Sequence, residues 1–102
     1  MELNEIKGLL ETLEQNAVSF DPHFYKRTAE RPINEGMVRK FLSQIELLDK
    51  IEHGKSSTRF KLWFKMSRNY SLILIIEISP SKHLKVISAW NASRKWQNKL
   101  KR

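Results

Sequence analysis

The 102-residue chain contains no cysteine and only three glycines and three prolines. Without cysteine there can be no disulfide framework, no thiolate nucleophile and no cysteine-ligated zinc or iron–sulfur site, so a reducing, cytoplasmic location fits best. The scarcity of glycine and proline argues for an ordered domain and against a disordered tail.

The sequence also lacks long apolar runs and the pattern of a secretory leader. The longest apolar run, Leu72 to Ile76, has five residues, whereas a membrane-spanning helix needs about twenty. The first residues, Met1 to Glu5, are acidic where a signal peptide would be basic and then continuously apolar. We therefore expect a soluble cytoplasmic protein that does not enter a membrane.

Positive charge is in excess. The chain has 19 Lys and Arg against 11 Asp and Glu, a formal net charge of +8 and an isoelectric point near 10.0. An anionic partner is the natural inference. Residues 1–16 are acidic, so this segment could cover a cationic surface or could simply have a solvated acidic side; the second interpretation is favoured.

The spacing of apolar residues predicts three helices in the first half of the chain. The first lies within residues 1–16, where leucine and isoleucine recur every three or four residues. Asp21 followed by Pro22 favours the start of a second helix, which runs to about Glu30. Asn34 is expected to cap a third helix. That helix buries one apolar face, formed by Met37, Val38, Phe41, Leu42 and Ile45.

From Leu47 onward the apolar period changes to two, which predicts strands. Four strands with short connections indicate an antiparallel meander. Val18 and Phe20 fit a further short strand, and a helix from Ser93 to Leu100 is expected to close the chain. The predicted fold class is therefore α+β, with helices packed on a four-stranded antiparallel sheet. The four expected strands are Leu47–His53, Thr58–Ser67, Tyr70–Ser79 and His83–Trp90.

The segment from Thr58 to Tyr70 carries the strongest functional signal, because apolar and cationic residues alternate along it. Successive side chains of a strand point to opposite faces, so one set can enter a core while the other presents three cations around one indole. RNA suits such a face, since phosphates pair with Lys and Arg and unstacked bases stack on a flat ring. The solvated outer face of an ordinary sheet is an equally weighted alternative. The apolar set is Phe60, Leu62, Phe64 and Met66, and the other set is Arg59, Lys61, Trp63 and Lys65.

His23, Arg27 and Arg31 are spaced by four, so a helix starting at Pro22 presents them as one stripe. Histidine exchanges protons near neutral pH, and the planar guanidinium of arginine stabilises charge on phosphate oxygens. These are parts that metal-free RNA cleavage needs. Ordinary surface ion pairing with nearby acids such as Glu30 is the competing interpretation.

Other catalytic and binding patterns are missing. There is no recognisable metal-ligand spacing, Gly-rich phosphate loop, serine nucleophile elbow or close pair of carboxylates, so neither a metal nor a cofactor is expected. Simple alternation in the last strand predicts His83, Lys85 and Ile87 on one face, and Ser88 and Trp90 on the other.

Between residues 18 and 90 the order of elements resembles small domains of the RelE and ParE type, within the wider superfamily of ribonuclease toxins that includes colicin and barnase-like folds. The likeness is greatest to an uncharacterised branch. It rests on His23, Arg27 and Arg31 on a helix, the turn Pro32–Glu35, a second helix and the strands that follow. The resemblance implies a curved sheet in one domain spanning residues 1–102, in which residues 1–16 form an extra N-terminal helix and residues 17–102 form the core.

The resemblance also implies two alternative functions. One is metal-independent endoribonuclease activity, with His23, Arg27 and Arg31 as catalytic residues. The other is non-catalytic binding of RNA, of the ribosome or of an acidic antitoxin-like protein. The sequence alone leaves open which applies, as it leaves open RNA versus DNA and the oligomeric state. Candidate nucleic-acid-binding residues are Arg59, Lys61, Trp63, Lys65, Arg68, Tyr70 and Lys85.

Overall fold

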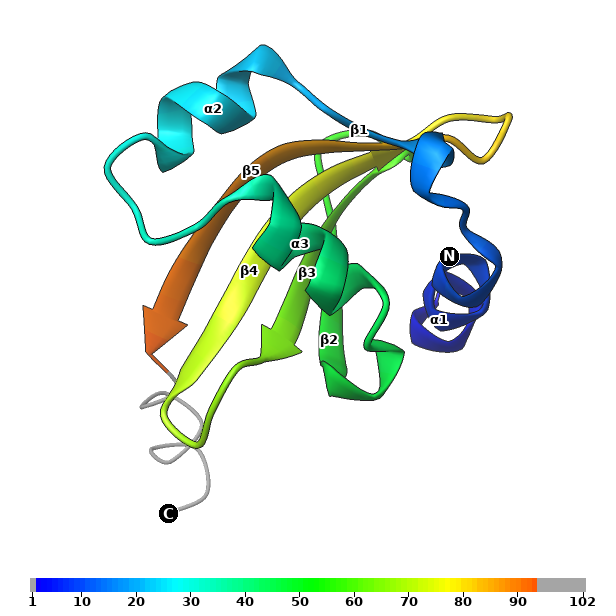
Figure 1. Ribbon diagram of the computed structural model, residues 1–102. Helices are drawn as coiled ribbons and strands as arrows, with labels where there is room; N and C mark the ends of the chain where they lie inside the picture. Colours follow the sequence, from blue (N-terminus) through cyan, green and yellow to red (C-terminus); the bar gives the residue numbers. More distant parts are fainter. Residues whose placement is uncertain (1, 94–102) are drawn as a thin grey trace.

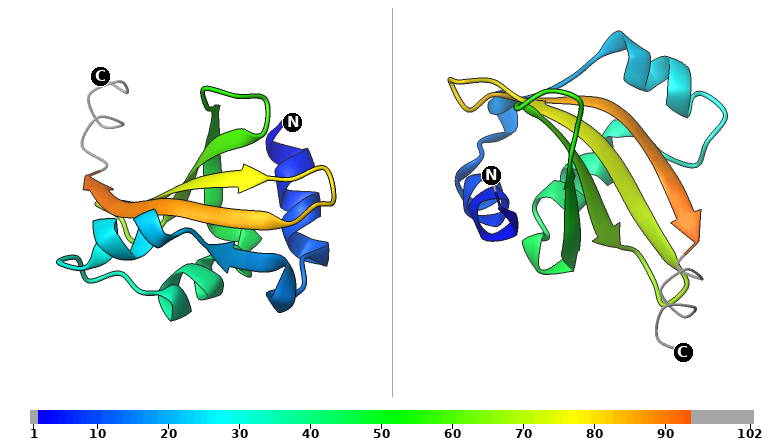
Figure 2. Two further views of the ribbon diagram at one scale, coloured as in Figure 1. Left: turned by 90° about the horizontal axis from the view of Figure 1, so that it is seen from above. Right: turned by 180° about the vertical axis from the view of Figure 1, so that it is seen from behind.

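A curved five-stranded sheet forms the centre of the structure, a computed structural model that describes residues 2–93 (Figures 1 and 2). The strand order is β1-β5-β4-β3-β2. Strands β2 to β5 form an antiparallel meander, and β1 pairs parallel to β5 at the sheet edge. The strands are β1 (Val18–Phe20), β2 (Leu48–His53), β3 (Arg59–Lys65), β4 (Tyr70–Ile78) and β5 (Leu84–Ser93).

The predicted α+β class is confirmed, but the prediction of a purely antiparallel four-stranded sheet is wrong. The short strand at Val18–Phe20 forms one edge of the sheet. The two following helices carry the chain to β2 at the other edge, and the meander then returns so that Leu84–Val86 of β5 lies beside β1 and parallel to it. The helix expected from Ser93 is not seen at its first residue, since Ser93 still pairs with Tyr70 as the end of β5. The rest of that expected helix lies outside the described residues.

Three α-helices accompany the sheet: α1 (Leu3–Thr12), α2 (Pro22–Thr28) and α3 (Glu35–Leu42). Short 3-10 turns at Gln15–Ala17 and Ile45–Leu47 lead into β1 and β2. The predicted caps are present. The Asp21 carboxylate accepts a hydrogen bond from the backbone N–H of His23 at 2.8 Å, and the Asn34 side-chain oxygen accepts one from the backbone N–H of Met37 at 2.9 Å.

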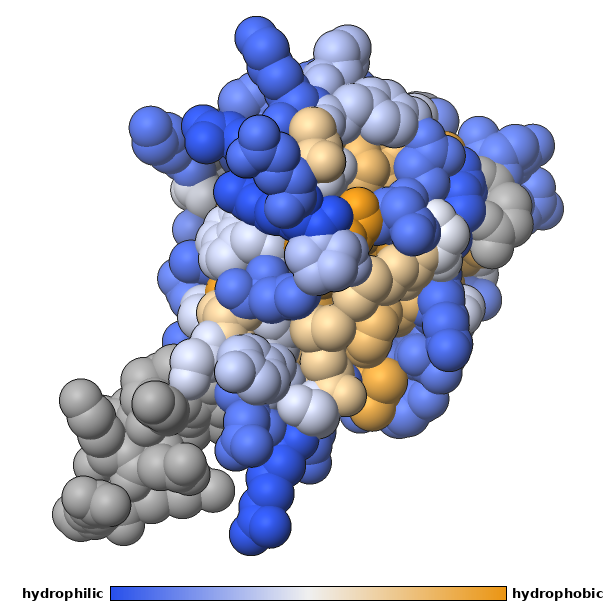
Figure 3. Space-filling view, turned by 60° about the vertical axis from the view of Figure 1, so that its left-hand side comes forward, coloured by the Kyte–Doolittle hydropathy of each residue, from blue (hydrophilic) through white to orange (hydrophobic). Residues whose placement is uncertain are grey.

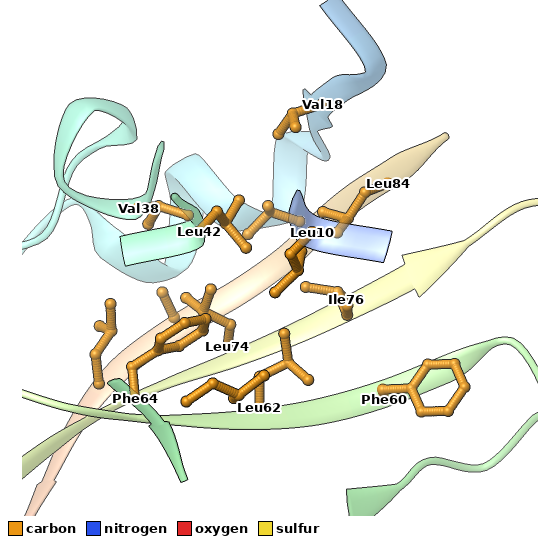
Figure 4. Close-up of a cluster of buried hydrophobic side chains, with 14 of the residues drawn as sticks. Leu10, Val18, Val38, Leu42, Phe60, Leu62, Phe64, Leu74, Ile76 and Leu84 are labelled. Carbon is orange, nitrogen blue, oxygen red and sulfur yellow. The ribbon is translucent and has the colours of Figure 1, made fainter. Parts of the chain in front are cut away.

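The hydrophobic core lies between one face of the sheet and helices α1 and α3, and its residues point toward one another in Figure 4. Phe60, Leu62 and Phe64 of β3 are almost fully buried, as the alternation in this strand predicts. Leu10 from α1 and Leu42 from α3 pack into the same cluster. The opposite side chains of β3 must therefore lie on the second face of the sheet.

Helix α1 packs against the core face and so does not cover the cationic side chains. Ile6, Leu9 and Leu10 are buried in the core cluster, whereas Glu5 and Glu11 are exposed. The acidic side of this helix is therefore solvated, as the favoured interpretation expected. Between residues 2 and 93, no helix combines the length and apolar content that a membrane crossing requires.

Candidate nucleic-acid interface

The second face of the sheet, called the open face below, is not crossed by any helix of residues 2–93 when the molecule is seen from behind (Figure 2, right). Arg59, Lys61, Trp63 and Lys65 of β3 lie on it, because their neighbours in the strand point into the core. The first three are half-buried and Lys65 is exposed. The predicted set of three cations around one indole is therefore present on one surface.

A β-bulge at Ile87 changes which residues of β5 reach the open face. The pairing between β4 and β5 shifts by one residue at this point. Beyond the bulge, Ser88 and Trp90 lie on the open face together with Lys85, and Ala89 points into the core, where it is fully buried. The prediction that Ser88 and Trp90 lie on the face opposite Lys85 is wrong, because one extra residue inverts the alternation that follows it.

Two tryptophans flank one isoleucine across the open face. Trp63 of β3 pairs with Ile73 of β4, which pairs with Trp90 of β5. Ile73 is only 1% exposed although it does not belong to the core cluster. The Lys61 ammonium lies over both indoles, 5.0 Å from the ring centroid of Trp63 and 5.5 Å from that of Trp90.

The indole of Trp63 is also held by residues of β2. Its Nε1–H donates to the Glu52 carboxylate at 3.0 Å, and the Lys50 ammonium lies 4.9 Å from its ring centroid. Lys50 and Glu52 form an ion pair at 3.4 Å. The sequence pattern alone did not single out Lys50 and Glu52, although their spacing of two in a predicted strand already places them on one face.

Helix α2 lies along the part of β5 that β1 leaves without a strand partner (Figure 1). Its buried residues, Phe24 and Thr28, face inward. His23 and Arg27 face the other way, whereas Arg31 lies in the turn after α2, because the helix ends at Thr28 and not near Glu30 as expected. These three residues, called the stripe below, line a hollow of about 300 Å³ at the border of the open face, called the α2 hollow below. Its remaining lining residues are Ile75, Ile87, Ser88 and Trp90.

The members of the stripe have different hydrogen bonds. Arg27 Nε donates to His23 Nε2 at 3.0 Å, which requires a neutral imidazole whose proton is on Nδ1. Arg31 Nη1 donates to the backbone carbonyl of Ala89 at 2.7 Å. Arg31 therefore fixes the turn after α2 to the edge of β5. The structure records a side-chain hydrogen bond from exposed Arg27 to His23, which is also exposed.

The other predicted binding residues lie away from the α2 hollow. Arg68 and Tyr70 are exposed near the turn between β3 and β4, and Tyr70 is 54% exposed. Arg59 forms an ion pair with Glu77 at 3.7 Å, while Lys85 lies opposite the same glutamate in the β4–β5 pairing. The structure thus joins Trp90 to the His23 stripe and to Lys61, but it does not bring the whole predicted set into one site.

A second hollow, of about 270 Å³, continues the surface beyond Lys61 and is called the hairpin hollow below. It shares Ile75 with the α2 hollow and is lined mainly by polar residues of the β2–β3 hairpin. Glu52, Lys55 and Arg59 are among them. Lys61 therefore lies between two depressions in the open face.

Helices α2 and α3 are joined by Tyr25 and Glu35, whose hydroxyl and carboxylate form a hydrogen bond. The bond to the Glu35 carboxylate is the main cause that raises the pKa of Tyr25 above its ordinary value of 10.0. Desolvation and the negative charge of Glu35 act in the same direction, and the positive charge of Arg39 opposes them. This contact helps to fix the orientation of the helix that carries His23 and Arg27.

In chemical terms, the site offers two guanidiniums for an anion, one imidazole for proton transfer and two indole faces for a flat ring. Among the described residues, no three His, Asp or Glu side chains gather in a way that could hold a metal ion. No protein-family model matches the chain, and no curated protein or solved structure matches it either.

Proposed function

We propose that this protein is an RNA-acting domain of the RelE-like toxin kind that binds single-stranded RNA across the open face of its sheet. One observation carries the proposal: the α2 hollow joins Arg27 and Arg31 to Trp90, whose ring also faces Lys61. Phosphates pair with guanidiniums, and unstacked bases stack on aromatic rings. Duplex RNA keeps its bases within the helix, so a single strand fits this combination better.

The formal charge of +8 supports an anionic ligand, and its electrostatic contribution predicts binding that weakens as salt rises. For single strands, the slope of log K against log salt changes by about 0.7 for each phosphate that a cation neutralises. An acidic antitoxin-like protein is the alternative occupant of the same cationic surface. It would compete with RNA for the open face.

Cleavage of the bound RNA is a second candidate function, favoured by the position of His23. This side chain is exposed and lines the same hollow as the two guanidiniums. The neutral imidazole could accept the proton of a 2′-hydroxyl once Arg27 releases Nε2, while the guanidiniums stabilise charge on the phosphate. Among the described residues that line the α2 hollow, none besides His23 carries an imidazole or a carboxyl group, so the leaving oxygen would take its proton from water.

The test of binding compares Arg27→Gln with Lys26→Gln on a labelled single-stranded RNA over a range of salt concentrations. Both variants remove one exposed positive charge from α2, but only Arg27 lines the α2 hollow. Arg27→Gln should lower the salt slope by about 0.7 and weaken binding more than the control does. Equal effects of the two variants, or an absence of binding at low salt, would refute the proposal.

The same incubation in EDTA tests cleavage. Metal-independent cleavage that disappears in His23→Ala would establish a ribonuclease that uses this imidazole. Intact RNA that still binds to the protein would leave binding as the function and exclude cleavage of that RNA.

A further inference from the structure

The faces of Trp63 and Trp90 are both directed at one side-chain group, the ammonium of Lys61. The two tryptophans come from different strands and are separated in the sheet by Ile73 alone. Two neighbouring strands are about 4.8 Å apart, so the backbones that carry the rings are separated by roughly 10 Å. The space between the ring faces is called the tryptophan slot below.

The size of the tryptophan slot suits one flat ring. A base in a stack occupies about 3.4 Å, so a base held between two rings needs ring planes roughly 7 Å apart. The Lys61 ammonium lies 5.0 Å from one ring centroid and 5.5 Å from the other, so the two centroids are close enough for side-chain rotations to bring the rings to either side of a base. The buried Ile73 provides an apolar floor between them. A ring of a nucleobase would therefore meet an apolar surface on three sides.

Lys61 has room to leave the tryptophan slot. Its side chain also lines the hairpin hollow, and Glu52 lies directly opposite it in the β2–β3 pairing. An exposed cation–π contact favours the position of the ammonium over the ring by a factor of about 2 to 5, whereas stacking of a base on an aromatic ring strengthens binding of the base by a factor of roughly 5 to 150. Exchange of the ammonium for a base is therefore favourable, and the displaced cation can pair with the Glu52 carboxylate.

We propose that Trp63 and Trp90 form a slot for one unpaired nucleobase, which Lys61 occupies in the free protein. This inference rests on the proposed function and specifies the ligand as a single unstacked nucleotide within a strand. Trp90 lines both the slot and the α2 hollow, so the phosphate next to the bound base lies beside Arg27 and Arg31. The bulge at Ile87 makes this arrangement possible, because it turns Trp90 toward the open face.

The experiment measures binding of two RNA chains that differ in one base. One is a fully abasic ribose–phosphate chain, and the other carries a single central purine. Both have the same phosphates, so the ratio of their affinities isolates the contribution of the base. The wild-type protein should bind the one-base chain roughly 5- to 150-fold more tightly. Trp90→Leu and Trp63→Leu should reduce this ratio toward one.

Two further variants distinguish the slot from a merely structural role of the rings. Trp90→Phe retains an aromatic face and should keep a ratio clearly above one, while its thermal unfolding reports whether the sheet is intact. Lys61→Met removes the occupant but leaves both rings, so the ratio should stay the same or rise while binding of the abasic chain weakens.

Equal affinity of the wild-type protein for the two chains, with both affinities still falling as salt rises, would overturn the slot and leave the proposed RNA binding intact. An unchanged ratio in both leucine variants would overturn it as well. Failure to bind any single-stranded RNA, including one with all its bases, would overturn the proposed function and the slot together.

Discussion

Arg31 and Arg27 line the same hollow, but the structure predicts that only Arg31 contributes substantially to stability. Arg31 is half-buried and donates to the backbone carbonyl of Ala89, a residue that is itself fully buried. That carbonyl belongs to the strand edge that β1 leaves uncovered. Arg31→Met keeps most of the aliphatic side chain and removes the donor, so the carbonyl loses this partner.

The expected loss of unfolding free energy in Arg31→Met follows from the kind of hydrogen bond that is removed. Bonds to charged groups contribute about 1.5 to 3 kcal/mol, and partial exposure of Arg31 places its bond at the lower end. We expect Arg31→Met to lower the free energy of unfolding by about 1.5 kcal/mol, and to lower Tm by roughly 6 to 12 °C for a domain of this size. Arg27→Met removes only a bond between two exposed side chains and should change stability by less than about 0.5 kcal/mol.

Urea unfolding followed by far-UV circular dichroism measures both variants under the same conditions. The two should unfold with the same m value, because neither changes the area that unfolding exposes. Equal losses of stability, or no loss in Arg31→Met, would show that the bond to the strand edge does not fix the turn after α2. The RNA affinity of Arg31→Met must be measured well below its Tm, so that lost binding is not confused with lost folding.

Three further predictions concern the frame around the site. Lys82 has a backbone φ of 64°, in the left-handed region that costs most residues roughly 1 to 2 kcal/mol. Lys82→Gly should therefore raise the free energy of unfolding by about 0.5 to 1 kcal/mol, and an unchanged Tm would show that the backbone at this position is not strained. Gly54→Ala would place a Cβ 2.9 Å from the Arg59 carbonyl oxygen, so it should lower Tm, as thermal unfolding would measure. The raised pKa of Tyr25 means that its bond to Glu35 stabilises the protein fully below pH 10 and is lost as pH rises through the folded-state pKa. Wild type should therefore be more stable than Tyr25→Phe at neutral pH, and this difference in unfolding free energy should shrink above pH 10; a constant difference would refute it.

Features that depend on neighbouring residues could be predicted from the sequence. Asp21 and Asn34 cap the helices that follow them because a short polar side chain reaches the first free N–H groups of its own helix. The alternation in Arg59–Lys65 fixed the faces of β3, since the strand has no register shift against β4. The spacing of four placed His23 and Arg27 on one side of α2, whereas Arg31 reaches the same hollow from the turn after the helix.

Features that depend on distant pairing could not be predicted in this way. The parallel contact of Val18–Phe20 with Leu84–Val86 joins segments far apart in the chain, and no local pattern specifies it. The bulge at Ile87 is equally invisible, because a strand with an extra residue has the same composition as one without it. Its effect is large, since it exchanges the faces of every residue that follows.

Packing explains why the bulge is needed at this point in β5. Without it, Trp90 would point into the core and Ala89 would lie on the open face. The core position beside Leu74 is fully buried and accommodates the small side chain of alanine, whereas an indole there would overpack a closed interior. The bulge therefore places the small alanine side chain in the core, and the same shift brings Trp90 to the open face, where Ile73 separates it from Trp63. The requirement that fixes the fold and the arrangement that we propose for RNA binding have a common cause in one extra residue.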